Sequence, residues 1–474
     1  MSDAPTLLWL RQDLRLADHP ALLAAAAEGP LLPVFVLDGA AAGRWAPGGA
    51  ARWWLHHSLE ALAADLAGRG APLLLLRGDA ARLVPALAWE TGASAVHATL
   101  MCEPWARRQD AAVAAALAAD GRRLSLHAGN LLLHPDAVRS GQNKPYGLYA
   151  PFARAVRAQV PPMEPIPAPP RLQAAACPRG GVALADLGLL PPAREGDWAA
   201  AFPEMLTPGE AGARERLHRF RRGVADYRAG RDSPAGDGTS RLSPHLRWGE
   251  LSPRQVWHAA AEQDGHEAFL REILWREFSH HLLWHRPELP DTALRPAYAR
   301  FPYRPDAMRL RAWQRGLTGY PIVDAGMRQL WRHGWMHNRV RMVAGSLLVK
   351  QLLQPWQEGA AWFWDTLVDA DLGNNSTNWQ WVAGSGLDAA PYFRIFNPVL
   401  QGRKFDPEGR YVRHFLPQLA RLPDRWLHEP WAAPAAVLRQ AGLRLGHDYP
   451  HPIVEPAQGR ADALAALGEL RAAA

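Results

Sequence analysis

Short apolar runs alternate with longer amphipathic segments over the first 130 residues. The apolar runs cover residues 6–10, 31–38, 72–79 and 93–100, and the Ala/Leu-rich segments between them repeat their apolar residues about every 3.6 positions. Buried strands that alternate with helices are typical of βαβ units, in which the strands pair in parallel. This pattern predicts an α/β N-terminal domain, a doubly wound parallel sheet, over residues 1–130.

The alternation stops beyond this region. Residues 161–170 contain six prolines, and the sequence to about 203 is rich in Ala, Gly and Pro, so we expect an interdomain linker over residues 131–206. Beyond it, helical periodicity dominates in segments 211–228, 253–263, 267–285, 321–353 and 358–369. We therefore predict an all-α C-terminal domain over residues 207–474.

Charge and cysteine content narrow the function. Residues 1–206 carry 18 basic and 18 acidic side chains, so the whole net charge of +7 lies in the C-terminal part, where an acidic partner would bind. The two cysteines are far apart in sequence, which argues against a disulfide framework, a Cys-rich zinc site and an iron–sulfur cluster. Because the sequence also lacks an apolar run of about 18 residues, we expect a cytoplasmic protein without a membrane segment.

Several clusters in the C-terminal part could carry chemistry. The stretch GTSRLS at 238–243 places hydroxyls beside a helix start, which suits phosphate oxygens, although such turns more often cap helices. Glu272, Trp275 and Arg276 share one helix face, and Asn338, Arg341 and Met342 share another; surface salt bridging is the plain alternative. Twelve of the 21 Trp lie between 248 and 381, which favours core packing for any single Trp and redox or base stacking near 378–381. We assign no metal site.

Eight segments in order resemble the photolyase/cryptochrome family. They are LWLRQDLR at 8–15, TSRLS at 239–243, EILWREF at 272–278, TGYPIVD at 318–324, WMHNR at 335–339, DADL at 369–372, WQW at 379–381 and YFRIFNP at 392–398. Within that family the chain is most similar to the bacterial class I enzymes that repair cyclobutane pyrimidine dimers. The resemblance implies an enzyme, a deoxyribodipyrimidine photolyase, with a U-shaped FAD in the helical domain.

The resemblance also implies which residues hold the flavin. Matched position by position, the phosphates would be held by Tyr227, Thr239, Ser240, Arg241, Leu242 and Ser243. The flavin and adenosine would be lined by Arg276, Asn338, Arg341, Asp369 and Asp371, and Asn375 would face flavin N5. A cation such as Arg341 suits an anionic reduced flavin, and a neutral amide at N5 adds no repulsive charge.

The implied substrate is UV-damaged DNA that contains a pyrimidine dimer. The dimer pocket would be formed by Glu272, Trp275, Asn338, Met342 and Trp381, with Arg231 and Arg339 on backbone phosphates. A stacked dimer cannot reach a buried flavin, so it must flip out of the duplex, as photolyase substrates do. Light-driven electron donation from reduced FAD would then split the dimer, and the electron would return.

Electron supply and light harvesting are also implied. Trp379 and Trp356 match the first two members of the family's photoreduction chain, whereas Tyr303 stands where the third Trp is expected. The N-terminal domain would hold a second, antenna chromophore; folate, deazaflavin and flavin remain open, as does a domain without one.

Three alternatives compete with this interpretation. A cryptochrome-type photoreceptor without repair activity is disfavoured by Asn375, by the intact dimer pocket and by the roughly 20 residues after Ile453, too few for a signalling tail. Repair of (6-4) photoproducts is disfavoured because Asn338 follows His337 where those enzymes carry a further histidine. A plain basic nucleic-acid-binding module would be colourless. We expect a monomer.

Overall fold

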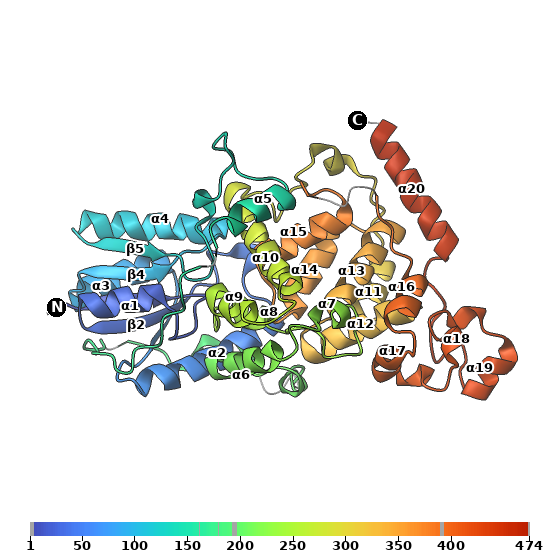
Figure 1. The fold of residues 1–474 in the computed structure, drawn as a ribbon, viewed down its shortest axis with the longest axis horizontal. Coiled ribbons are helices and arrows are strands. Elements are labelled where there is room, and N and C mark those ends of the chain that lie inside the picture. The colour runs from blue at the N-terminus through green and yellow to red at the C-terminus, as the bar shows by residue number, and fades with distance from the viewer. Residues whose placement is uncertain (1–3, 161, 179, 192–196, 389–392, 473–474) are drawn as a thin grey trace.

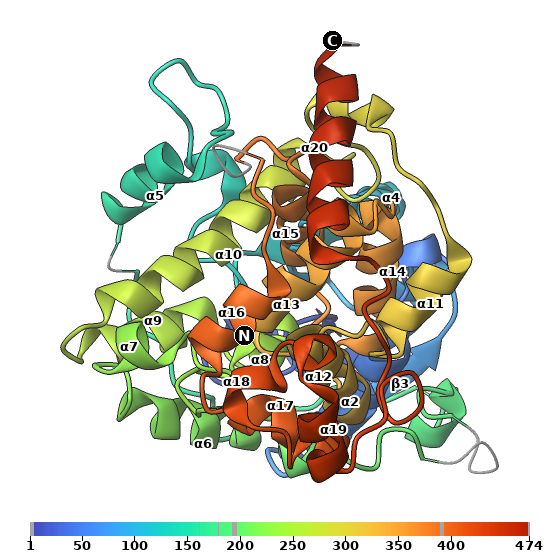
Figure 2. The ribbon, with the colours of Figure 1, turned by 90° about the vertical axis from the view of Figure 1, so that its right-hand side faces the viewer.

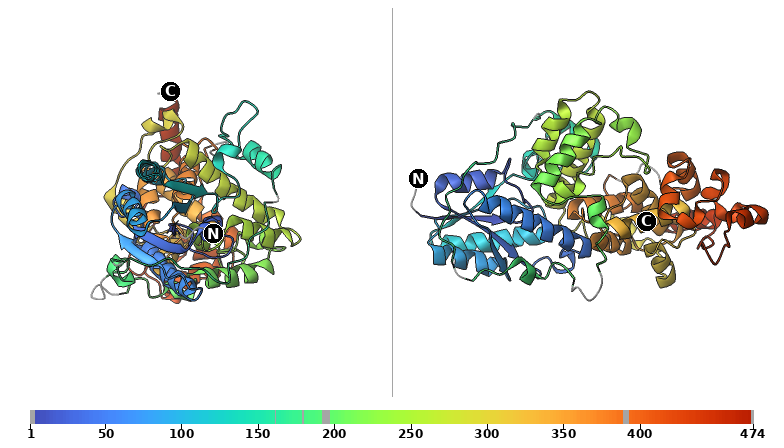
Figure 3. Two further views of the ribbon diagram at one scale, coloured as in Figure 1. Left: turned by 90° about the vertical axis from the view of Figure 1, so that its left-hand side faces the viewer. Right: turned by 90° about the horizontal axis from the view of Figure 1, so that it is seen from below.

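The fold is described from a computed structural model of the chain. It describes all residues except 1–3, 161, 179, 192–196, 389–392 and 473–474, so Tyr392 of the last family motif lies outside the described residues. The sheet and its helices form one end of an elongated molecule, and the helices of the C-terminal half form the other end (Figures 1 and 3).

The N-terminal sheet has five parallel strands in the order β3-β2-β1-β4-β5. The strands are β1 (Thr6–Leu10), β2 (Leu31–Leu37), β3 (Leu74–Arg77), β4 (Ala95–Thr99) and β5 (Arg123–His127). Four of them lie in the predicted apolar runs. β5 was not predicted as a separate strand, because it is only partly buried and carries only two leucines. The order reverses at β1, which confirms the doubly wound fold class.

Helices cover the faces of this sheet and connect its strands (Figure 1). They are α1 (Pro20–Glu28), α2 (Gly49–Ala67), α3 (Ala80–Thr91) and α4 (Pro104–Ala119). The N-cap of α1 is His19, whose Nδ1 accepts from the backbone N–H of Leu22 at 3.1 Å.

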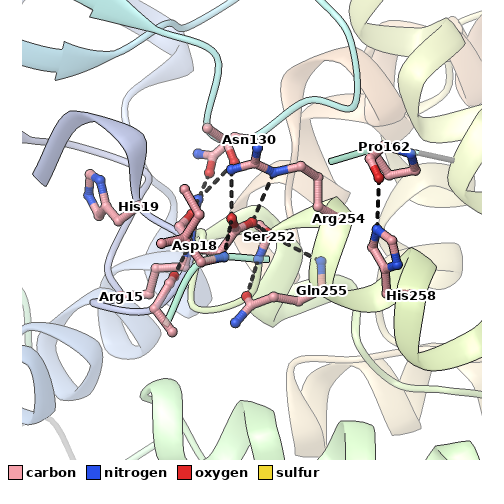
Figure 4. A network of polar contacts seen from close by, with 12 residues as sticks. Arg15, Asp18, His19, Asn130, Pro162, Ser252, Arg254, Gln255 and His258 are labelled. Carbon is pink, nitrogen blue, oxygen red and sulfur yellow. Dashed lines mark hydrogen bonds and ion pairs between the residues drawn. The ribbon is translucent and has the colours of Figure 1, made fainter. Parts of the chain in front are cut away.

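Asp18, just before this cap, joins the two halves of the molecule (Figure 4). Its backbone has φ of +51°, and its buried carboxylate accepts hydrogen bonds from Ser252 and from Arg254, the latter at 2.6 Å. Arg15 adds a bond to the carbonyl of Gly249 at 2.9 Å. A buried ion pair of this kind fixes the sheet relative to the helices, because removing one partner leaves an uncompensated charge.

The described residues beyond 207 form helices and contain no β-strand, which confirms the predicted all-α character. The helices are α6 (Glu210–Arg221), α7 (Tyr227–Gly230), α8 (Ser243–Arg247), α9 (Pro253–Ala261), α10 (Glu267–His285), α11 (Ala307–Gln314), α12 (Pro321–His333), α13 (Asn338–Ser346), the π-helix η7 (Leu347–Gln351), α14 (Trp356–Thr366), α15 (Leu372–Ala383), α16 (Pro398–Phe405), α17 (Arg410–Phe415), α18 (Asp424–Leu427), α19 (Ala435–Ala441) and α20 (Pro456–Ala472), with the 3₁₀ turn η6 (Pro296–Arg300).

Two predicted helices are divided in the structure. The segment 321–353 is interrupted at Gly334, whose φ of +63° ends α12, so α13 begins a new direction. The segment 211–228 likewise splits into α6 and α7. Both breaks reorient residues of the predicted site.

Helix α10 is central to the helical half. It packs against α15 and against α5 (Tyr149–Arg157), a helix inside the predicted linker. Figure 2 shows α10, α13, α15 and α16 on one side of the molecule, with α20 rising beside them. Among the described residues, no helix combines the length and apolarity needed to cross a bilayer.

Candidate functional site

Asp369 brings together three segments that are distant in sequence. Its Oδ2 accepts a hydrogen bond from the hydroxyl of Ser243 at 2.6 Å and another from Nη2 of Arg341 at 2.9 Å. Arg341 also donates from Nε to the carbonyl of Met336 at 2.7 Å, which fixes its guanidinium. Three of the residues predicted for flavin binding are therefore in direct contact, and a buried carboxylate is paired with a cation.

Asp371 starts α15 and is held in its ionised form. Its Oδ1 accepts from the backbone N–H of Asn374 at 2.7 Å, and Oδ2 lies 3.3 Å from Nε2 of His280. Burial alone would raise the pKa of Asp371. The neighbouring His280, Arg247 and Arg276 lower it by more than burial raises it, so the pKa lies below its usual range. The sequence did not indicate His280 or Arg247, which lie on other helices.

The loop that carries Thr239, Ser240 and Arg241 is held from behind by Arg216. This side chain donates to the carbonyls of Thr239 at 2.9 Å and Ser240 at 2.7 Å. Arg241 has φ of +51°, which a non-glycine residue rarely adopts, and it forms an ion pair with Asp237 at 3.1 Å. Arg216 was not predicted, because nothing in its local sequence signals a contact 23 residues away.

Several buried polar atoms in this region have no hydrogen-bond partner among the described residues. They are Nε of Arg241, Nε1 of Trp335 and Oδ1 of Asp369. The guanidinium carbons of Arg241 and Arg341 lie 5.6 and 5.9 Å from the ring of Trp335, so these atoms belong to one connected set. Buried polar groups are normally paired, and a ligand with phosphate and sugar oxygens would pair them. The residues present therefore fit FAD.

Asn375 and Arg276 are each held by backbone carbonyls. The amide of Asn375, one turn after Asp371, donates to the carbonyl of Ala360 on α14 at 3.0 Å. Arg276 donates to the carbonyl of Asn130 at 2.8 Å. These bonds fix the orientation of both side chains. Asn375 is the residue matched to the position that faces flavin N5.

Leu242 and Tyr227, also predicted for the flavin, are buried. Leu242 is part of the helical core. The ring of Tyr227 lies 5.1 Å below the guanidinium carbon of Arg231, and burial raises the pKa of its hydroxyl. Both shape the region around the loop through packing.

The predicted lesion residues lie on α10, α13 and α15. Glu272 on α10 forms an ion pair with Arg231, so two residues assigned to different parts of the substrate are partners without DNA. Asn338 and Met342 lie one turn apart on α13, with Nδ2 and Sδ 4.0 Å apart. Trp381 lies near the end of α15.

Trp275 is held by a ring that the sequence did not indicate. Tyr149 on α5 stacks on it with centroids 3.6 Å apart and an interplanar angle of 5°. The hydroxyl of Tyr149 donates to the carbonyl of Arg271 at 3.0 Å, and its backbone N–H donates to Asp388 at 2.7 Å. Tyr149 thus covers one face of the indole, and no local signal in the predicted linker marked it.

Arg339, the second predicted phosphate contact, is also paired. Its Nη2 donates to Asp232 at 2.6 Å, and its guanidinium carbon lies 4.5 Å from the ring centre of Phe405 on α16. Both predicted phosphate-binding arginines therefore have carboxylate partners in the protein.

The predicted electron-transfer residues are buried at the α14–α15 contact and beyond. Trp379 lies with its ring centre 6.3 Å from that of Trp313 and 5.1 Å from that of Phe363. Its ring edge fits against Gly359, where an added Cβ would lie 2.1 Å from Cη2. This close approach explains the glycine.

Trp356 and Tyr303 occupy different surroundings. Trp356 begins α14 and is 2% exposed. Tyr303 packs against Phe301, with ring centres 4.8 Å apart, and burial raises the pKa of its phenol. A neutral phenol at this position would have to release its proton on oxidation.

Comparison with known proteins gives consistent results over the whole chain. Residues 6–171 match the family described as DNA photolyase, and residues 269–469 match the FAD binding domain of DNA photolyase. A deoxyribodipyrimidine photo-lyase of Agrobacterium fabrum is 46% identical over 99% of both chains. Cryptochrome-2 of Arabidopsis thaliana is 37% identical over 96% of this chain and 77% of its own length.

Solved structures give the same assignment. A bacterial class III photolyase from Agrobacterium tumefaciens superposes with a TM-score of 0.95 and 45% identity, over 100% of this chain and 98% of that one. The predicted likeness to class I enzymes is therefore not confirmed and stays a prediction. An archaeal photolyase from Sulfolobus tokodaii, with a TM-score of 0.84 and 26% identity over 98% and 100% of the two chains, contains two FAD molecules, one implicated as a light-harvesting cofactor.

These matches confirm the predicted family, the predicted class of enzyme and the predicted FAD cofactor, and they agree with a second chromophore of unidentified kind. The matches do not assign roles to individual residues, so the roles given above remain predictions. The chain belongs to the DNA photolyase family.

Proposed function

We propose that this protein repairs cyclobutane pyrimidine dimers in DNA. The supporting observation is that α10, α13 and α15 each carry residues of both predicted sets. Arg276 lies beside Trp275, Arg341 lies beside Met342, and Asn375 lies on the same helix as Trp381. Because α15 packs against both α10 and α13, the three helices that carry the two predicted sets are in contact.

The bound FAD would supply the electron that splits the dimer and would accept it back. Around it, the protein's own groups hold charge and orientation. The guanidinium of Arg341 is fixed by Asp369, so it offers a permanent positive charge at the predicted flavin site. The amide of Asn375 is fixed by Ala360 and brings no charge.

For the lesion, the side chains would replace what flipping removes. The free face of Trp275 offers stacking, worth about 1–3 kcal/mol per base, and Glu272 offers hydrogen bonds to base edges. Arg231 and Arg339 would hold phosphates without reading sequence. In the protein each of them holds a carboxylate, and a phosphate would compete with that carboxylate for the guanidinium.

Trp379, Trp356 and Tyr303 are proposed to carry electrons inward when the flavin is oxidised. A second chromophore in the sheet domain is proposed to collect light, with its identity open between folate, deazaflavin and flavin. The family resemblance places Glu103 at an antenna-contact position; this residue is buried and accepts a hydrogen bond from Gln12 at 2.9 Å. We further propose that the protein acts as a cytoplasmic monomer.

The test is repair itself. Reduced protein is illuminated with an oligonucleotide that contains one thymine dimer, and the recovery of thymine absorbance near 260 nm is followed. Recovery that requires both light and protein supports the proposal. A flavin-containing protein that leaves the dimer intact but repairs a (6-4) lesion would contradict the substrate, and one that repairs neither would support a photoreceptor.

A further inference from the structure

A cavity opens beside Trp381, one of the residues predicted for the dimer pocket. Its volume is about 260 Å³, and its walls come from the end of α15, from η6 and η7, from residues 393–396 and from α20. Helix α20 packs against η7 and η6, and the cavity lies between these elements and the end of α15. The cavity therefore shares Trp381 with the predicted dimer pocket.

The charges that line this cavity all have one sign. Arg295, Lys350, Arg394 and Arg471 are among its lining residues, and the lining includes no Asp or Glu. None of the four has an ion-pair partner among the described residues, whereas other surface arginines such as Arg44, Arg157 and Arg221 do. Four unpaired cations around one cavity attract an anion.

Lys350 is the deepest of these cations. It is 1% exposed, its Nζ donates to the carbonyl of Ala383 at 2.8 Å, and it lies 3.3 Å from the ring centre of Phe393. Burial alone lowers its pKa to about 7. An uncompensated amine at this depth costs folding free energy, and an anion in the cavity would offset that cost.

Aromatic residues form part of the remaining walls, together with aliphatic residues such as Leu467 and Leu470. Trp381, Tyr298 and Phe396 line the cavity with Phe393, and the charges of Arg295 and Arg471 both act on the Tyr298 phenol, whose pKa burial raises and they lower. Aromatic faces stack with bases, and arginine forks bind phosphate oxygens. The combination fits a base that carries a phosphate.

We propose that this cavity is a subsite for the nucleotide that flanks the dimer in the damaged strand. The inference rests on the proposed function, because Trp381 would then separate the flipped dimer from its neighbour. A free mononucleotide has the same chemistry, but the shared Trp381 wall favours the strand.

The experiment compares dimer oligonucleotides that end at the lesion with others that extend by one or two nucleotides on the 5′ or the 3′ side. Dissociation constants are measured by fluorescence anisotropy for the wild type and for R295Q/R471Q, with R439Q on exposed α19 as matched control. On one side, the first added nucleotide is expected to tighten wild-type and R439Q binding about tenfold, and this gain is expected to vanish in the double variant. For the wild type, a flanking nucleotide that lacks its base should give only part of this gain in affinity.

An equal gain in the double variant, or no gain on either side, would overturn the subsite. So would tight binding of thymidine monophosphate without any effect of strand length. Both outcomes differ from failure of the proposed function, which would appear as absent repair and equal affinity for damaged and undamaged strands. K350M gives a second measurement: it should lose the same gain while keeping its flavin absorbance.

Discussion

Arg231 and Glu272 form an ion pair that joins the end of α7 to α10 in the DNA-free protein. Burial alone would lower the pKa of Arg231, but the carboxylate of Glu272 raises it by more than burial lowers it, so the guanidinium stays charged. One residue is assigned to a phosphate and the other to the dimer. In the proposed complex with damaged DNA, an internal contact would be exchanged for two external ones, so the net gain would be smaller than the sum of the two external contacts.

Glu272→Ala should weaken binding of dimer DNA about tenfold and leave the FAD content unchanged. A hydrogen bond to a charged group contributes about 1.5–3 kcal/mol, and release of Arg231 offsets part of its loss. Anisotropy gives the affinity, and absorbance at 450 nm gives the flavin content. E267Q, on the exposed start of the same helix, is the control. Loss of FAD from Glu272→Ala would show that Glu272 was misassigned.

Arg339→Gln should reduce the salt dependence of DNA binding. If Arg339 leaves Asp232 to contact one phosphate, its loss lowers the slope of log K against log salt by about 1. The weakening should be similar for damaged and undamaged duplexes, because a phosphate contact carries no sequence information. Titrations between about 50 and 200 mM salt measure the slope, with R439Q as control. An unchanged slope would place Arg339 off the DNA.

The sequence predicted most of the sheet, because its strands are short apolar runs with clear boundaries. β5 was missed since it is a partly buried edge strand. The division of 321–353 follows from Gly334, a visible signal whose effect depends on a left-handed backbone. Family motifs identified the members of the Asp369 cluster. They could not identify Arg216 or Tyr149, because these contact the motifs through tertiary packing and no local signal marks the contact.

Asp369→Ala should empty the flavin site. It removes the shared acceptor of Ser243 and Arg341, so the partly buried guanidinium loses both its carboxylate partner and its fixed position at the predicted flavin site. We expect purified protein with little absorbance at 450 nm and poor reconstitution with FAD. E90Q on exposed α3 is the control. Asp369→Asn, which keeps an acceptor oxygen, should retain more FAD than Asp369→Ala; equal flavin content in both variants and the wild type would contradict the assignment.

Trp379→Phe should abolish photoreduction of oxidised flavin and leave repair by chemically reduced protein. Only the first process needs an electron donor in the protein. Absorbance changes under blue light with an external reductant measure photoreduction, and W89F, with an exposed indole on α3, is the control. A reduced Trp379→Phe protein that cannot repair would contradict the separation.

Gly359→Ala tests the same indole without changing it. The added Cβ would overlap the ring of Trp379, so the ring must move, at a cost of roughly 1–3 kcal/mol in stability. Photoreduction should slow although the indoles of Trp379 and Trp356 are both still present. G468A, at a helical glycine of α20 with open space around it, is the control, because it adds the same methyl group to a helix without an overlap.

The pH dependence of the free energy of unfolding should show the lowered pKa of buried Lys350. Its pKa is about 7 in the folded protein against 10.5 in the unfolded chain, so between these values the unfolded chain binds the extra proton. Stability from this group therefore rises with pH across that window and is lowest below pH 7. The free energy of unfolding of the wild type minus that of K350M should increase between pH 7 and pH 9.5, measured by urea titration, because other groups cancel in the difference.

An anion bound in the cavity favours the charged amine, so adding a dimer oligonucleotide with one flanking nucleotide should shift this rise to higher pH. A difference that stays constant with pH would mean that Lys350 remains charged in the folded protein, and that its burial is already compensated.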